Sequence, residues 1–268
     1  AVEAEDLALI QGPPGTGKST AIAELIWQLV RKSPKSKILL TSEANLAVDN
    51  ALDKLKYTNH NIVKPIRIAA GDKFSAEGLS YAVTEMKKWA GLELDDIELE
   101  DDLSIQDLDE YKSFDKRNLV LNRWLRNILI RSKERALNAE HHKQWFDILS
   151  DPPMHWREKI YNEYRLHCNV IGATCSAISD TNYSASNRLD KYVPSRFIKK
   201  YWSIYKKNIH DKGPNLRFDV VIQDEASKAT PAELSMPLSY GKKAVVIGDH
   251  RQLPPNLDKE DILFKLQM

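Results

Sequence analysis

A glycine-rich stretch near the N-terminus has the residue types and spacing of a phosphate-binding loop. "GPPGTGKST" occupies residues 12–20 and fits the pattern G-x-x-x-x-G-K-[ST]. It lies between an apolar run, "LALI", and a helix-like run, "AIAELIWQLV", which is the strand–loop–helix context that the pattern requires. Such a loop turns backbone N–H groups toward phosphate oxygens at the N-terminus of a helix. The residues expected to contact the nucleotide are Gly12, Pro13, Gly15, Thr16, Gly17, Lys18, Ser19 and Thr20.

A pair of carboxylates follows a second apolar run, "FDVVIQDEAS" at residues 218–227. Asp224 is expected to hold Mg²⁺ together with the hydroxyl of Ser19, and Glu225 to orient and deprotonate a water that attacks the γ-phosphate. Lys18 is expected to reach the terminal phosphates. A carboxylate base aimed at water favours hydrolysis over a phosphotransferase, which must exclude water. These residues predict ATP and Mg²⁺ as the bound species.

A third segment, "VVIGDHRQLPP" at residues 245–255, places a polar turn after another apolar run. Gln252 is an uncharged side chain that can bond the γ-phosphate and respond to its loss. The predicted catalytic residues are therefore Lys18, Glu225 and Gln252.

The order "IQGPPGTGKST", "DEAS" and "GDHRQLPP" resembles the first motor lobe of superfamily 1 helicases, in the 5′-to-3′ branch that includes senataxin and the nonsense-mediated-decay helicases. The resemblance covers residues 7–71 and 168–257. It implies a RecA-like lobe that binds ATP–Mg and single-stranded DNA or RNA and works against a second RecA-like lobe. We expect that second lobe in a part of the protein outside this chain, and the fragment alone to hydrolyse ATP weakly.

Two further segments resemble family motifs that contact nucleic acid. "ILLTSEANLAVDNALDKL" at residues 38–55 resembles motif Ia, and "VIGATCSA" at 170–177 resembles motif Ic. The resemblance implies Asn45 and Thr174 as nucleic-acid contacts. The sequence departs from the family at Glu43, an acidic residue that would weaken binding near a phosphate path, and at Gln223, where an apolar residue is usual.

The elements that must position these residues are short apolar runs suited to buried parallel strands. They occur at residues 7–11, 37–42, 66–71, 169–175, 218–223 and 243–248, and helical patterns follow several of them. This alternation predicts a RecA-like α/β fold with a doubly wound parallel sheet, whose carboxyl edge carries the motifs. Residues 72–167 break the alternation with helical periodicity. The Trp and Leu stripe there favours helix–helix packing over a base-stacking surface, and its apolar positions are Leu121, Trp124, Leu125, Ile128, Leu129, Trp145, Phe146 and Leu149. We therefore expect a discontinuous lobe, 1–71 and 168–268, that carries a helical accessory insertion, 72–167.

Composition excludes some classes of protein. The chain has 268 residues, 42% of them hydrophobic and 29% charged, enough for a full globular core. No stretch approaches the roughly 20 apolar residues of a membrane span, and no signal pattern begins the chain, so we expect an intracellular protein, cytoplasmic or nuclear if eukaryotic, without a membrane partner. Cys168 and Cys175 are expected to be buried thiols, and the histidines lack metal spacing.

Charge is segregated although the net charge is only +1. From Glu93 to Glu110 there are ten acidic side chains and no Lys or Arg, whereas residues 181–217 carry nine Lys or Arg and two Asp. The acidic stretch is either a solvated or disordered segment, or one that repels nucleic acid or occupies a basic groove when the protein is idle. The basic segment, which also contains aromatic residues, is either a single-stranded nucleic-acid contact or an amphipathic helix.

Together these patterns predict an ATP-dependent helicase or translocase. The alternative is a nucleotide-gated nucleic-acid switch or scaffold, which shares the same motifs and does not unwind a duplex.

Overall fold

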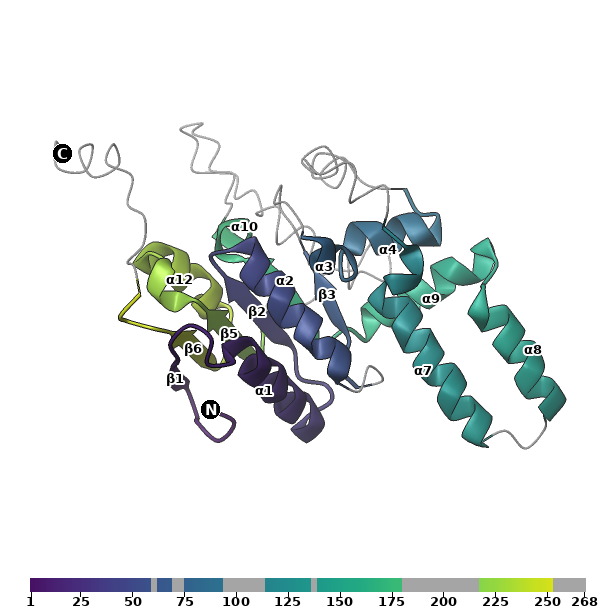
Figure 1. Cartoon of the computed structure of the whole chain (residues 1–268), viewed down its shortest axis with the longest axis horizontal. Helices are drawn as coiled ribbons and strands as arrows, with labels where there is room; N and C mark the ends of the chain where they lie inside the picture. Colours follow the sequence, from purple (N-terminus) through teal and green to yellow (C-terminus); the bar gives the residue numbers. More distant parts are fainter. Residues whose placement is uncertain (59–61, 69–74, 94–113, 136–138, 180–216, 253–268) are drawn as a thin grey trace.

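A six-stranded, fully parallel sheet forms the centre of the protein. The computed structural model describes residues 1–58, 62–68, 75–93, 114–135, 139–179 and 217–252. The strands lie in the order β1-β6-β5-β2-β4-β3 (Figure 1). Their bounds are β1 Leu7–Gln11, β2 Ile38–Ser42, β3 Pro65–Arg67, β4 Val170–Thr174, β5 Val220–Asp224 and β6 Ala244–Gly248. All six strands overlap apolar runs in the sequence, and the last three residues of the run at 66–71 lie outside the described residues.

Helices that connect the strands cover the sheet. The helix α1 (Lys18–Lys32) begins directly after the glycine-rich loop and packs beside α2 (Asn45–Lys54), which also contacts β2 and β4. Two further helices, α10 (Cys175–Ser179) and α12 (Pro231–Ser239), pack against each other. The first also contacts β4 and the second contacts β5. Thr230 and Glu233 form a capping box at the start of α12, which fixes its first turn. The predicted RecA-like α/β architecture is confirmed.

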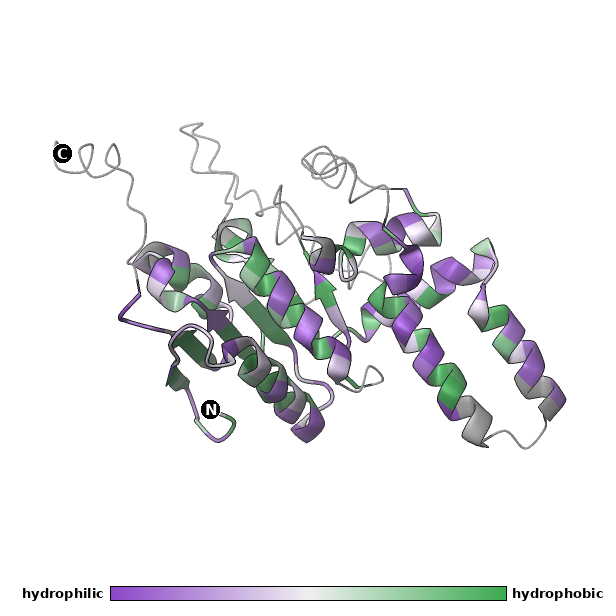
Figure 2. Cartoon of the chain, viewed as in Figure 1, coloured by the Kyte–Doolittle hydropathy of each residue, from purple (hydrophilic) through white to green (hydrophobic). Residues whose placement is uncertain are grey.

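Apolar residues of the strands and of the inward faces of the helices make one continuous core. All five residues of β2, β4 and β5 are buried, and Figure 2 shows the hydrophobic residues concentrated along the strands. Cys168 and Cys175 are buried free thiols, as expected. Burial also raises the pKa of the Cys175 thiol.

Between β3 and β4 the described chain is helical. The elements there are α3 (Ala76–Leu79), α4 (Val83–Ala90), η2 (Lys116–Asn118), α7 (Val120–Arg135), α8 (Ala139–Ser150) and α9 (Met154–Leu166). The rings of Trp124 and Tyr164 meet edge to face at 5.6 Å, and the Tyr164 hydroxyl donates to the Pro65 carbonyl at 2.9 Å. These helices are therefore anchored on the sheet through α7 and α9.

The apolar side chains of α7 and α8 differ in how deeply they are buried. Leu121, Leu125 and Leu129 are buried, so the expected helix packing is confirmed for α7. On α8, Trp145 and Phe146 were expected to pack in the same way, yet both are about half exposed. Trp145 contacts Trp156 of α9 with ring centroids 6.0 Å apart, which covers one part of its surface.

The described helices include none long and apolar enough to cross a membrane. The two charge-segregated stretches, except for Glu93 and Arg217 at their ends, lie outside the described residues.

Candidate nucleotide site and adjoining polar network

The glycine-rich loop runs from the end of β1 to the start of α1. Its first residue is fixed to a neighbouring strand because the Gly12 N–H donates to the Gly248 carbonyl of β6 at 3.0 Å. Gly15 and Gly17 have φ of 74° and 83°, a left-handed conformation that favours glycine. Gly17 is the N-cap of α1 and has no side-chain cap, so the first N–H groups of this helix face the loop. This geometry suits an anion above the helix terminus.

Lys18 folds back over the loop. Its Nζ donates to the Gly12 carbonyl at 2.9 Å and to the Pro13 carbonyl at 3.3 Å. The Thr16 hydroxyl also donates to the Pro13 carbonyl, at 2.7 Å. The ammonium group is thus already held where the loop encloses its ligand. Both contacts are with carbonyl oxygens, which a phosphate oxygen can replace at little cost.

Asp224 ends β5 at the same edge of the sheet. The side chain is buried, with 3% of its surface exposed, and burial raises the pKa of this carboxyl group. A hydrogen bond from the Glu225 N–H at 2.8 Å and the positive charge of Lys18 offset part of that rise. Lys18 is therefore close enough to act on this carboxylate electrostatically.

Glu225 has an uncommon backbone conformation. Its φ of 49° is the one positive φ of a non-glycine residue in the described ranges. Its carboxylate accepts a hydrogen bond from Lys228 Nζ at 2.9 Å, and the side chain remains partly exposed. Strained residues of this kind are often retained where a side chain must be aimed at a ligand.

Gly248 joins the three motifs at the end of β6. Its carbonyl accepts the Gly12 N–H, and a Cβ built at Gly248 would lie 3.2 Å from the Ser227 nitrogen in the turn after Glu225. Asp249, which follows, is buried and accepts the Arg251 N–H at 3.1 Å, while the Gln252 N–H donates to the Asp249 carbonyl at 3.0 Å. Asp249 therefore shapes the turn that leads to Gln252.

A row of polar side chains crosses the sheet edge beside Asp224. Ser42 pairs with Asp224 of β5 and with Thr174 of β4 in the parallel register. The Ser42 hydroxyl is buried and has no hydrogen-bond partner among the described residues. A buried hydroxyl in that state calls for a water, an ion or a ligand. With the poorly compensated Asp224 carboxylate, this oxygen-rich edge fits a hydrated Mg²⁺, which prefers oxygen ligands and keeps several of its waters.

Asn45 and Asp49 lie one turn apart on the same face of α2, where Asn45 is partly buried and Asp49 fully buried, and both contact one cation. Arg67 of β3 is fully buried and donates from Nε to Asp49 Oδ1 at 2.9 Å and from Nη2 to Asn45 Oδ1 at 2.6 Å. Its Nη1 donates to the Ile68 carbonyl at 2.6 Å. The second oxygen of Asp49 accepts the Ser75 N–H at 3.0 Å. Because the Asn45 oxygen faces Arg67, its NH₂ group is turned away from that cation.

Thr174 is buried, and its hydroxyl accepts the Ala177 N–H at 3.1 Å at the start of α10. Nearby, Gln223 donates from Nε2 to the Cys175 sulfur at 3.3 Å and to the Asp224 carbonyl at 3.1 Å. Thr41 also contacts this sulfur, at 3.5 Å. Gln223 thus belongs to a buried polar cluster under the sheet edge. The nucleic-acid contacts expected for Asn45 and Thr174 remain predictions.

Sequence reasoning missed Arg67, Ser42 and Asp249. A single arginine inside the apolar run "IRIAAG" was the available signal for Arg67, because a buried cation requires a partner. Ser42 and Asp249 carried no signal of their own, since small polar residues are common where strands end.

The chain is similar in sequence to a known domain family and to proteins named as ATP-dependent helicases. The sequence pattern of the AAA domain family matches residues 1–193 and 207–260. The chain is 29% identical over 280 residues to an uncharacterized ATP-dependent helicase of Methanocaldococcus jannaschii, covering 97% of this chain and 37% of that protein. It is 28% identical over 267 residues to the DNA polymerase alpha-associated DNA helicase A of Saccharomyces cerevisiae, covering 96% of this chain and 31% of the helicase.

A further relative is the regulator of nonsense transcripts 1 of Caenorhabditis elegans, 27% identical over 254 residues, with 93% of this chain and 17% of that protein covered. The chain therefore spans well under half of the length of these relatives.

Proposed function

Because the chain belongs to the AAA domain family, in its superfamily 1 helicase branch, we propose that it is the first motor lobe of an ATP-driven nucleic-acid helicase or translocase. The observation that carries this proposal is the convergence of the glycine-rich loop, Asp224–Glu225 and the Asp249–Gln252 turn around Gly248. Three segments far apart in the sequence meet at one end of the sheet, where ligands of such folds bind.

In this proposal the lobe comprises residues 1–71 and 168–268, the helical insertion comprises 72–167, and a second RecA-like lobe completes the motor. The site between the lobes would close on ATP and reopen after hydrolysis. Supporting the lobe assignment, all six strands lie outside the proposed insertion. Action on nucleic acid would place the whole protein inside the cell.

Each site residue has a proposed role in ATP hydrolysis. The loop N–H groups and Lys18 bind the phosphates, and Ser19 and Asp224 hold Mg²⁺. When bound, Mg²⁺ neutralises charge on the phosphate oxygens. Glu225 orients and deprotonates the attacking water, and Gln252 contacts the γ-phosphate. The positive φ of Glu225 and its contact with Lys228 support a side chain held in a fixed direction.

Single-stranded nucleic acid is the proposed track. The NH₂ group of Asn45 is left to donate to a phosphate oxygen because Arg67 occupies the carbonyl side of the same amide. Because the Thr174 side chain is buried, nucleic acid would contact the main chain of this residue, or the side chain only after a local rearrangement. Relatives include both a named DNA helicase and a named regulator of nonsense transcripts, so either polymer is a reasonable track.

The experiment is ATP hydrolysis by the full-length parent protein, alone and with single-stranded DNA or single-stranded RNA at fixed low salt. We expect one of the two polymers to stimulate ATP hydrolysis strongly, and that polymer is then identified as the one along which the motor moves. ATP-dependent binding of the polymer without stimulated turnover or strand separation would favour the switch or scaffold instead. If a phosphorylated acceptor forms from labelled ATP, the protein is a phosphotransferase and not an ATP hydrolase.

A further inference from the structure

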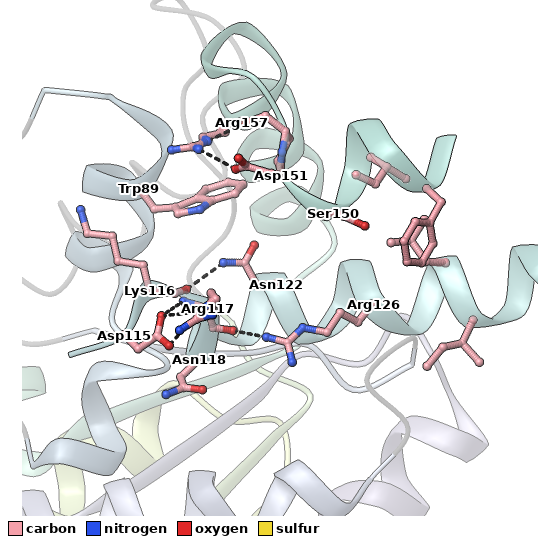
Figure 3. A pocket seen from close by; sticks show the side chains of 15 residues that line it. Trp89, Asp115, Lys116, Arg117, Asn118, Asn122, Arg126, Ser150, Asp151 and Arg157 are labelled. Carbon is pink, nitrogen blue, oxygen red and sulfur yellow. Dashed lines mark hydrogen bonds and ion pairs between the residues drawn. The ribbon is translucent and has the colours of Figure 1, made fainter. Parts of the chain in front are cut away.

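A second hollow lies away from the nucleotide site, among the helices between β3 and β4. It has a volume of about 830 Å³ and is lined by α4, η2, α7, α8 and the start of α9. This volume is within the range of ligand pockets, roughly 300–1,000 Å³. Figure 3 shows Trp89, Asp151 and Arg157 facing Lys116, Arg117 and Arg126 across it. None of these residues has a role in the proposed ATP site.

One wall of this pocket is apolar and open to solvent. Leu129 and Ile130 line it from α7, and Phe146 and Leu149 line it from α8. Ile130 and Phe146 expose 61% and 48% of their surfaces, although both are large apolar side chains. Exposed apolar residues gathered in a hollow with a polar rim are typical of binding sites.

The spacing of the lining residues describes a groove between two helices. On α7 the lining residues Arg126, Leu129 and Ile130 follow an i, i+3, i+4 pattern, and on α8 Phe146, Leu149 and Ser150 repeat it. Two such rows on adjacent helices form ridges with a groove between them. A third helix with apolar residues at the same spacing would fit into this groove.

The rim of the pocket carries an excess of positive charge. The rim has four cationic side chains and two carboxylates, a net charge of +2. The cations are Lys116, Arg117, Arg126 and Arg157, and the carboxylates are Asp115 and Asp151. Arg117 pairs with Asp115 at 2.8 Å and Arg157 with Asp151 at 3.1 Å. Within the described part of the chain, Lys116 and Arg126 form no close ion pair with a carboxylate, although the charge of Arg126 also acts on Asp115. An acidic ligand would supply the missing charges.

Hydrogen bonds hold this rim in place. Arg126 Nη2 donates to the Arg117 carbonyl at 2.6 Å, and Asn122 Nδ2 donates to the Lys116 carbonyl at 2.8 Å. Asp115 accepts the Arg117 N–H at 2.9 Å and so caps η2. The turn of η2 is therefore fixed to α7, and a partner would meet a preorganised surface.

Features of the pocket favour a peptide over a nucleic acid. The aromatic ring of Trp89 is covered by the Arg157 guanidinium, 5.5 Å from its centroid, so this ring offers no free face to a base. The rest of the apolar wall is mainly aliphatic, which suits Leu or Ile side chains from a helix.

From this combination we infer that the groove between α7 and α8 binds an acidic amphipathic helix of a partner protein. Apolar side chains at i and i+4 of that helix enter between Ile130 and Phe146. Its Asp or Glu side chains lie against Lys116 and Arg126. The inference is independent of the ATP site and of the proposed motor activity.

The test uses a displayed library of random peptides of about 12 residues, which is roughly three helical turns, selected for binding to this chain. Enriched peptides are then synthesised, and their affinities are measured by fluorescence anisotropy. We expect enriched sequences with aliphatic residues at i and i+4 and with several Asp or Glu. For these peptides, Ile130→Ser and Arg126→Glu should each weaken binding about tenfold or more.

Two matched control variants separate the groove from the general surface. Arg131→Glu makes the same charge change on an exposed neighbour in α7, and Tyr57→Ser removes an exposed ring elsewhere; both should bind like wild type. Thermal unfolding of each variant verifies folding. Ile130 and Arg126 are both exposed, and Arg126→Glu removes one hydrogen bond, the one to the Arg117 carbonyl. The inference is overturned if no peptide is enriched, if enriched peptides lack acidic residues, or if Ile130→Ser and Arg126→Glu leave binding unchanged. Loss of oligothymidylate binding in these two variants, without loss of peptide binding, would also overturn it by identifying a nucleic-acid surface.

Discussion

Asp49 of α2 and Asp224 of β5 are both buried carboxylates, yet their surroundings differ sharply. Asp49 is fully buried and receives a guanidinium N–H and a backbone N–H from Arg67 and Ser75. Asp224 is nearly as buried, but its carboxylate receives a single hydrogen bond among the described residues, from the Glu225 N–H. Burial leaves the pKa of Asp224 raised.

The difference separates a carboxylate that is compensated inside the protein from one that is not. A buried charge is stable when a cation and hydrogen bonds replace its lost hydration. Asp49 has that compensation inside the protein, where it links α2, β3 and the start of α3. Asp224 lacks most of it, which is the state expected of a residue whose cation arrives with the nucleotide. Two buried carboxylates in recognisable motifs can thus differ in their effect on stability, because one is compensated by neighbouring groups and the other is not.

The largest effect is expected at Glu225, beside Asp224. In the full-length parent protein, Glu225→Gln should lower turnover by about 10²–10⁴-fold because glutamine cannot act as a general base. ATP affinity should be kept because glutamine has nearly the same size and shape as glutamate. Steady-state hydrolysis and nucleotide binding measure the two properties. Glu24→Gln, on the exposed face of α1, is the control and should change neither. Normal turnover by Glu225→Gln would remove this residue from the base role.

Asp49→Ala should have the largest effect on folding. It leaves the Arg67 guanidinium buried without its carboxylate, a change that costs about 3–5 kcal/mol of unfolding free energy. Denaturant unfolding measures this loss. Asp53→Ala, one turn later on α2, breaks an ion pair with Lys56 that is closer to solvent and should cost less than about 1 kcal/mol.

A double substitution sharpens this test. Asp49→Leu with Arg67→Met replaces both charges by apolar groups and should recover most of the stability lost in Asp49→Ala. If the double variant is as unstable as the single one, packing rather than the unpaired charge explains the loss.

Lys18→Ala should have the smallest effect on folding. The ammonium contacts only loop carbonyls, so the unfolding free energy should change by less than about 0.5 kcal/mol. ATP–Mg should no longer protect the variant against unfolding. A thermal-shift titration compares it with Lys35→Ala, an exposed lysine outside the loop that should keep full protection. Retained protection in Lys18→Ala would contradict a phosphate contact by this side chain.

The sheet and its loop could be predicted from sequence because their signals are local. Apolar runs predict parallel strands, and Gly12 to Ser19 define a loop by spacing alone. The Asn45–Asp49–Arg67 network could not be predicted, because its members lie on α2 and on β3 and meet only after folding. The half-exposed Phe146 shows the same limit, since helical periodicity indicates an apolar face but not what covers it.

The most direct test of the contrast between the two carboxylates is the unfolding free energy of wild type and Asp224→Asn, each titrated with ATP–Mg. Without nucleotide, Asp224→Asn should be as stable as wild type or more stable, because it removes a buried and poorly compensated charge. Wild type should gain about 1.4 kcal/mol at ten times its Kd for ATP–Mg, and Asp224→Asn should gain much less. An Asp224→Asn protein that is destabilised like Asp49→Ala, yet retains the full gain from ATP–Mg, would show that Asp224 is structural and not part of the ligand site.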